Sequence, residues 1–208
     1  MSDKDYTGLV PEQTTGKEIT ADASVKVDDT EAHDAFEKAK KKLLHVNDWQ
    51  KLTGALGAGF QVFDADAQQV NREVRKGDFL RIDIPGPGST AGNGYDWAKV
   101  EDLKTYNKDD VESIAFIVRP TSNPHTNSDV VAHFYAPEST STFTVTREKN
   151  KITAAIYDRN IEANEQASEP SDKLRNQAVG KSAKHAFSKL QWQALVNEWV
   201  KEIEELRG

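Results

Sequence analysis

The chain has 208 residues and a formal net charge of −7, and it contains no cysteine. This length suits one domain with a short extension. Without cysteine the chain has neither disulfides nor thiolate metal sites, and its acidic balance argues against a general nucleic-acid-binding protein. No apolar run approaches the ~20 residues that a membrane span needs. A cytoplasmic location fits this composition.

Most of the negative charge lies near the N-terminus, where the first 34 residues hold nine acidic and three basic side chains. Residues 1–20 are polar and rich in turn-forming residues, which predicts an acidic N-terminal arm that is flexible or loosely packed. We expect residues 21–208 to form a single domain that opens with a short strand near residues 24–27.

Two short helices are predicted between residues 28 and 53. In the first, Asp28 and Glu31 have the spacing of a capping box. In the second, Asn47 is expected to be the N-cap and Trp49 to face inward, before a glycine-rich stretch ends the helix. The predicted apolar face of the first helix consists of Ala32, Phe36, Ala39 and Leu43.

From Phe60 to Tyr157 the apolar period changes to two, which is typical of strands. The turns between these segments are short enough for antiparallel hairpins, so a meander is the simplest topology. A Gly/Pro-rich loop is expected at residues 85–94, and a loop with some helix at residues 158–180. The strand segments are 59–63, 70–74, 79–84, 97–103, 114–118, 130–135, 142–147 and 152–157.

The last segment carries the clearest helical pattern in the chain. Ser188 and Gln191 have capping-box spacing, and Trp192 and Trp199 belong to one apolar face. A second apolar stripe lies nearly opposite this face. Either the helix breaks at Ser188, or one intact helix is buried on two sides, for example by a partner subunit; the capping pattern favours the break. The second stripe consists of Ala183, Phe187, Leu190 and Ala194.

These elements predict an α+β fold: a curved antiparallel sheet of six or seven strands wrapped around a long C-terminal helix, with two short helices near the N-terminus. The helix pair ending in Asn47-Asp48-Trp49, the strand series and the Trp-bearing last helix resemble the helix-grip superfamily over roughly residues 22–206. That superfamily includes START domains, the birch-pollen-allergen family and polyketide-cyclase-like proteins. The main alternative is a cone-shaped barrel of the nuclear-transport-factor type, but such chains usually end on a strand.

The resemblance implies a hydrophobic or amphipathic small molecule held between sheet and terminal helix, since members of the superfamily typically bind one there. Some members are enzymes and many only bind. This chain departs from the pattern in two ways. It is longer than the compact members, and its Gly-rich loop follows the third sheet strand, one hairpin later than in the allergen-like members.

Sequence motifs for cofactors and metals are weak. The stretch Gly86-Pro87-Gly88-Ser89-Thr90-Ala91 follows a strand as a dinucleotide fingerprint does, but its proline and the later glycines predict a continuing loop instead of a helix. The five histidines form no H-x-x-H or H-E-x-x-H pair. We therefore expect neither a cofactor nor a metal.

The functional expectation is a protein that binds a small hydrophobic or amphipathic molecule, with no nucleic acid and no membrane span. One alternative is a cyclase- or hydrolase-type enzyme that uses His133 with Asp83 as the acid. Another is an interaction protein that forms a homodimer through its terminal helical region. The face on which His133 lies depends on strand register, because a one-residue slip exchanges the two faces. The candidate ligand-contacting residues are Trp97, Arg119, His133, Tyr135, Arg147, Tyr157, Trp192 and Trp199.

Overall fold

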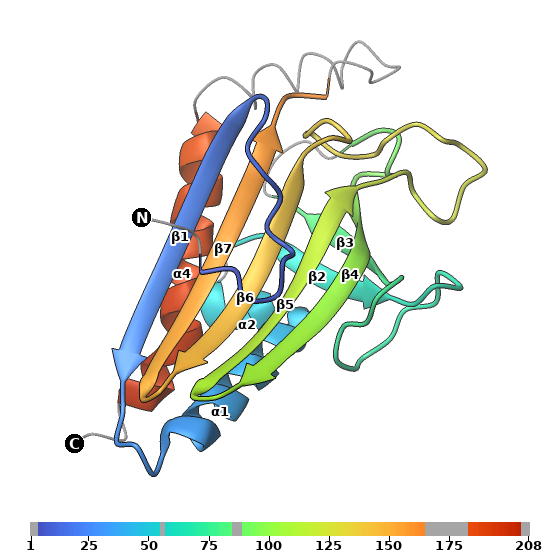
Figure 1. The fold of residues 1–208 in the computed structure, drawn as a ribbon. Helices are drawn as coiled ribbons and strands as arrows, with labels where there is room; N and C mark the ends of the chain where they lie inside the picture. The colour runs from blue at the N-terminus through green and yellow to red at the C-terminus, as the bar shows by residue number, and fades with distance from the viewer. Residues whose placement is uncertain (1–3, 55–56, 85–88, 165–182, 205–208) are drawn as a thin grey trace.

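The computed structural model describes residues 4–54, 57–84, 89–164 and 183–204, the side chains of 183–187, 202 and 204 excepted. A seven-stranded sheet curves around the helices (Figure 1). The elements are β1 (Lys17–Lys26), α1 (Ala32–Leu44), a 3-10 turn η1 (Val46–Asp48), α2 (Trp49–Thr53), β2 (Gly59–Phe63), β3 (Phe79–Asp83), β4 (Asp96–Lys108), β5 (Val111–Pro120), β6 (Thr140–Glu148), β7 (Lys151–Ile161) and α4 (Ala183–Glu204).

The sheet has the strand order β1-β7-β6-β5-β4-β3-β2, and every neighbouring pair is antiparallel. Strands β2 to β7 therefore form the predicted meander, and β1 returns to pair with β7 at the far edge. Two-residue turns join β4 to β5 and β6 to β7, and each places one residue, Asp109 or Lys149, at a φ of 54°. The predicted α+β fold is confirmed.

All described helices lie on one side of the sheet (Figure 1). Helix α4 packs against β1 and β7, while α1 packs against β6 and β7. This arrangement gives the sheet a concave face that is covered by helices and a convex face that points away from them. None of the helices in the described part of the chain has the length and apolar character of a membrane span.

Trp49 of α2 lies at the centre of the core. It is fully buried, and its ring centroid is 5.4 Å from that of Trp199 in α4 and 5.0 Å from that of Phe143 in β6. Its indole N–H donates to the carbonyl of Lys42 at 3.0 Å. One side chain therefore joins the N-terminal helices, the terminal helix and the sheet.

Helix α1 buries its predicted apolar face, but neither predicted helix cap forms. Helix α1 begins at Ala32, so Glu31 is the N-cap residue itself, and its side chain makes no capping hydrogen bond. Asn47 lies within η1 and bonds to distant backbone instead. Its Oδ1 accepts the N–H of Val62 at 2.7 Å, and its Nδ2 donates to the carbonyl of Val70 at 2.8 Å. Asn47 thus holds β2 and the chain that follows it against the helices.

The predicted break at Ser188 is wrong, because α4 runs unbroken through this residue. Ser188 is buried, and its Oγ lies 3.3 Å from the Oη of Tyr135, so it contacts another segment instead of capping a helix. The predicted second stripe is only partly described, since the side chains of Ala183 and Phe187 lie outside the described residues. In the rest of that stripe, Leu190 is 71% exposed.

Residues 70–74 do not form the predicted strand. After one backbone hydrogen bond, from Val70 N to the carbonyl of Val62 at 3.0 Å, the chain leaves the sheet and reaches α1, where Val74 N bonds to the carbonyl of Leu44 at 3.0 Å. The apolar residues of this segment therefore face the helix layer, which explains why their pattern resembles that of a strand.

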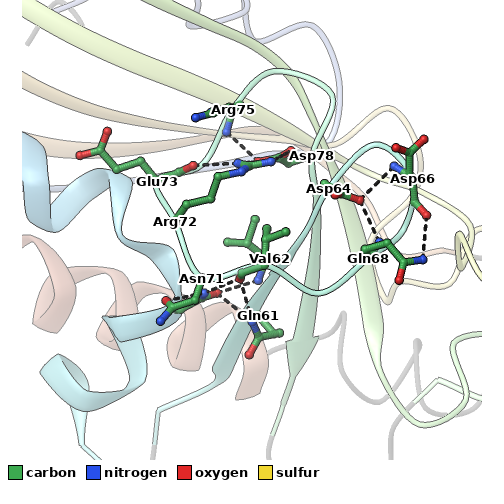
Figure 2. A network of polar contacts seen from close by, with 12 residues as sticks. Gln61, Val62, Asp64, Asp66, Gln68, Asn71, Arg72, Glu73, Arg75 and Asp78 are labelled. Carbon is green, nitrogen blue, oxygen red and sulfur yellow. Dashed lines mark hydrogen bonds and ion pairs between the residues drawn. The ribbon is translucent and has the colours of Figure 1, made fainter.

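Polar side chains hold the connection between β2 and β3 (Figure 2). Asp78 is 2% exposed and accepts two hydrogen bonds from the guanidinium of Arg72, at 2.6 and 2.9 Å, and one from the N–H of Arg75 at 2.8 Å. Asp64 Oδ1 accepts the N–H of Gln68 at 2.9 Å. Charge-assisted bonds of this kind are strong, so the connection is ordered without joining the sheet.

Residues 130–135 also differ from prediction, since their described β pairing consists of isolated bridges, Ser122 with Val131 and Tyr135 with Ala163, and not of a strand in the sheet. The segment spans the ends of two strands: Ala132 N bonds to the carbonyl of Thr121, beyond β5, at 2.9 Å. At its other end Asn164 N, beyond β7, bonds to the carbonyl of Phe134 at 2.9 Å. The strand-like pattern here arises because the segment is buried between the chain that follows β5 and the chain that follows β7, and not because it belongs to the sheet. The predicted loops at residues 85–94 and 158–180 lie partly outside the described residues, and in the described part residues 158–161 belong to β7 instead of a loop.

The N-terminal segment, residues 4–16, crosses the convex face of the sheet, opposite α4 (Figure 1). Leu9 is buried there with Ala115 and Ile117 of β5, and its carbonyl accepts the hydroxyl of Thr142 at 3.1 Å. Strand β1 begins directly after this segment, at residue 17, which is earlier than the predicted strand. The segment predicted as an arm is therefore anchored by an apolar side chain and by hydrogen bonds.

Leu9→Ala should lower the free energy of unfolding by about 2 kcal/mol, the low end for a buried leucine, because the segment can settle into the space. Urea denaturation measures this as a lower midpoint with an unchanged slope. Val10→Ala, at the half-buried neighbouring position, is the control and should cost less than half as much. Equal effects of the two substitutions would contradict the observed packing of Leu9.

Candidate functional site

A cavity lies between the concave face of the sheet and the N-terminal half of α4. Strands β2 to β6 supply its floor, residues 133–135 close one side, and α4 supplies the roof through Ser188, Gln191 and Trp192. Its walls are mostly apolar, and the described lining includes no Lys, Arg, Asp or Glu. The apolar wall includes Phe60, Leu80, Ile82, Ile84, Val118, Phe134 and Phe143.

The cavity volume is about 60 Å³, which is room for about four water molecules. Small-molecule pockets are commonly larger, roughly 300–1,000 Å³. Aromatic rings in the wall, among them those of Phe60, Phe134 and Trp192, limit the space. An occupant larger than a few atoms therefore requires these rings to move.

One end of the cavity is polar. Ser141, Tyr135 and Ser188 contribute hydroxyls to the lining, and Ser141 lies opposite Asp158 in the register of β6 and β7, where its side chain favours the charged form of that carboxyl. The indole N–H of Trp192 donates to Asp158 Oδ2 at 2.8 Å. The polar groups thus form a cluster around one buried carboxyl.

Strand parity explains why Asp158 points inward. Side chains alternate along β7, so Asp158 shares the concave face with Ile156 and Ala154, which belong to the core. Across the sheet, Asp158 pairs with Ser141 of β6 on one side and with Ile19 of β1 on the other. A carboxyl therefore occupies an inward-facing position on β7, whereas the preceding inward-facing residues of the same strand are apolar.

Burial raises the pKa of Asp158 to about 6, because a charged carboxylate is poorly stabilised away from water. Hydrogen bonds from Ser141 and Trp192 and the charge of Arg159 oppose this rise. The guanidinium of Arg159 bonds to the carbonyl of Ile19 at 3.4 Å and to that of Asp158 at 3.0 Å. Asp158 Oδ1 has no hydrogen-bond partner among the described residues.

Tyr135 and His133 lie beside this carboxyl end. Burial and the charge of Asp158 raise the pKa of Tyr135 strongly, so its phenol stays protonated. His133 is 7% exposed, and its Nδ1 accepts the N–H of Tyr135 at 2.9 Å. In neutral His133 the proton is therefore on Nε2. Asp83 is exposed on β3 and does not line the cavity, so the cavity does not bring His133 and Asp83 together.

Of the eight residues predicted to contact a ligand, His133, Tyr135 and Trp192 line this cavity. Two of the others are core residues away from it. Trp97 is buried with Phe63 and Ala132 on the convex side, and Trp199 packs on Trp49.

The remaining three are engaged elsewhere. Arg119 pairs with Glu101, with Nε to Oε1 at 2.7 Å. Arg147 pairs with Glu112, with Nε to Oε2 at 2.5 Å. Tyr157 accepts the N–H of Lys4 at 3.2 Å, beneath the N-terminal segment. In the described part of the chain, no three His, Asp or Glu side chains come together in a way that could hold a metal ion.

No family model and no curated protein matches the sequence. Among solved structures, a conserved protein from Geobacillus kaustophilus is similar, with 12% identity, a TM-score of 0.44 and coverage of 91% of this chain and 96% of that one. Norcoclaurine synthase from Thalictrum flavum has 10% identity, a TM-score of 0.42 and coverage of 99% and 96%. Ara h 8.0201 has 11% identity, a TM-score of 0.37 and coverage of 89% and 99%.

The last two proteins belong to the helix-grip superfamily that the sequence layout resembles. At these identities and scores they carry no information on the ligand or reaction of this chain. The helix-grip layout described above rests on the strand order and on the position of α4.

Asp158 is the site residue that the sequence analysis missed. An aspartate that directly follows a predicted strand, here 152–157, normally indicates a surface ion pair at the strand end. A signal for its position was present, because the alternation of Ile152, Ala154 and Ile156 continues in phase to Asp158. Extending the strand by one more period places a carboxyl on the apolar face.

Asp158→Asn should stabilise the fold at neutral pH. In the folded chain Asp158 keeps its proton up to about pH 6, whereas an unfolded aspartate releases it near pH ~4. Between these two pH values the folded state binds more protons than the unfolded state. The contribution of Asp158 to the free energy of unfolding therefore falls as the pH rises through this range, and it is constant above it. The gain at pH 7.5 should be on the order of 2–3 kcal/mol, with little difference below about pH 4.

Urea denaturation of the wild type and the variant across pH 3.5–8 measures this difference directly. Asp22→Asn, at an exposed position of β1, is the matched control and should leave the pH profile unchanged. A constant difference between wild type and Asp158→Asn at all pH values would contradict the raised pKa.

Proposed function

We propose that this protein binds a small apolar or amphipathic molecule in the cavity between the sheet and α4. The observation that carries the proposal is the composition of the cavity: a wall of aliphatic and aromatic side chains with hydroxyl groups gathered at one end. Binding sites for small molecules commonly combine these two features, since the apolar wall supplies affinity and a few polar groups fix orientation.

The size of the cavity restricts the occupant. About 60 Å³ accepts a compact group, and a larger molecule enters only if the rings of Phe60, Phe134 and Trp192 turn aside. Trp192 also bonds to Asp158, so a ligand that displaces its ring breaks this bond. We therefore expect compact ligands, with affinity limited by the small number of atoms that they bury.

Val118→Phe tests the proposal by filling the cavity from β5, where Val118 is part of the lining. The variant should no longer bind isobutanol, which two-dimensional NMR measures as changes in amide chemical shifts. It should also lose any molecule that copurifies with the wild type, which mass spectrometry of the denatured protein detects. Leu190→Phe on the exposed face of α4 should keep both. The thermal unfolding midpoint of Val118→Phe shows whether it is folded. Binding to folded Val118→Phe at wild-type strength would place the ligand elsewhere.

A further inference from the structure

The polar end of the cavity allows a more specific statement about the ligand, which rests on the function proposed above. We propose that the cavity selects a compact apolar amine, whose ammonium group lies at the hydroxyls of the polar end and pairs electrostatically with the carboxylate of Asp158 behind them. Asp158 is then a specificity-determining residue, and the hydroxyls are the direct contacts.

The first observation is the incomplete hydrogen bonding of Asp158. A carboxylate offers about four acceptor positions, and the donors at Asp158 are the neutral groups of Trp192 and Ser141. Its Oδ1 is buried without a partner among the described residues. Buried charges in proteins are normally paired or coordinated, because desolvating them is costly. A buried carboxylate with one oxygen open to a further partner beside a cavity therefore favours a cation as the occupant.

The second observation is the distribution of charge around this carboxyl. Arg159 contributes a favourable charge, but its guanidinium is bound to the backbone around β1, at the carbonyl of Ile19. On the cavity side Asp158 is approached by Tyr135, Trp192 and Ser141, which carry no positive charge. Among the described residues, no cation therefore faces Asp158 from the cavity side, and a carboxylate in this position favours a cationic occupant over an anionic one.

The third observation is the hydrogen-bonding capacity of the polar end. An ammonium group donates three hydrogen bonds and accepts none. The oxygens of Ser141, Tyr135 and Ser188 line the same end of the cavity and can accept them. Because Ser141 lies opposite Asp158 in the strand register, its hydroxyl proton can point toward the carboxylate and leave a lone pair toward the ligand. A carboxylate ligand finds few donors there.

The test compares four probes of similar size at pH 7.5 by NMR titration: isobutylamine, isobutanol, 3-methyl-2-butanone and isobutyrate. We expect isobutylamine to bind at least fivefold more tightly than the ketone, isobutanol to lie between them, and isobutyrate to show no binding. Asp158→Asn should reduce the preference for the amine over the ketone to less than twofold. Asp22→Asn, an exposed carboxylate on β1, should keep the wild-type preference.

A second readout uses the wild type alone and does not depend on a variant that folds. The pKa of Asp158, followed by its side-chain carbon resonance, should fall when isobutylamine is added, because a nearby cation favours the charged carboxylate. Isobutanol should lower it less.

The outcomes separate this inference from the proposed function. Equal binding of amine and ketone, or a preference that survives in Asp158→Asn, overturns the assignment of an amine while the cavity remains a binding site. Absence of binding by all four probes overturns both. An amine preference that disappears in Asp158→Asn, together with a lowered pKa of Asp158, supports the inference.

Discussion

The packing of Trp49 against Trp199 is the contact on which the architecture depends. It fixes α4 over the concave face at the end where α1 and α2 also meet the sheet, and the Trp49 ring also packs on Phe143 of β6, with centroids 5.0 Å apart. Aromatic pairs of this kind bury large areas and prefer defined geometries. Nearer the N-terminus of α4, Trp192 packs against Phe60 and Phe143, with ring centroids 6.2 and 5.5 Å apart, and the cavity lies beside these rings.

At the Asp158 end of the cavity, the fold is less stable than an apolar residue would make it. A leucine in place of Asp158 would continue the apolar face of β7, whereas the carboxyl there is buried and its Oδ1 is unpartnered among the described residues. Natural proteins violate the rules of core packing mainly at functional sites, because such groups are kept for what they do. The geometry of Trp192 and Ser141 supports this view, since Trp192 bonds to the carboxyl, Ser141 lies opposite it in the register, and both line the cavity.

Sequence patterns predicted correctly which face of a helix is buried. They were misleading for side chains that hydrogen-bond to a segment far away in the sequence. The apolar face of α1 was predicted correctly because helical spacing is a local property. Asn47 and Ser188 were expected to cap helices, yet Asn47 bonds to β2 and Ser188 to Tyr135. A capping residue and a tertiary contact use the same side-chain types, so sequence alone does not separate them. Residues 130–135 alternate like a strand because two neighbours bury them.

The sequence by itself determined the α+β order, the antiparallel meander and the inward face of β7, since periods of 3.6 and two residues are written into the local chain. Only the tertiary structure decided which inward residues meet. Register brings Ser141 opposite Asp158, and α4 brings Trp192 to it from 34 residues away in the sequence. The raised pKa of Asp158 comes from the burial that these contacts complete. A carboxyl becomes a candidate binding group when the rest of the molecule excludes water from it, which no local pattern records.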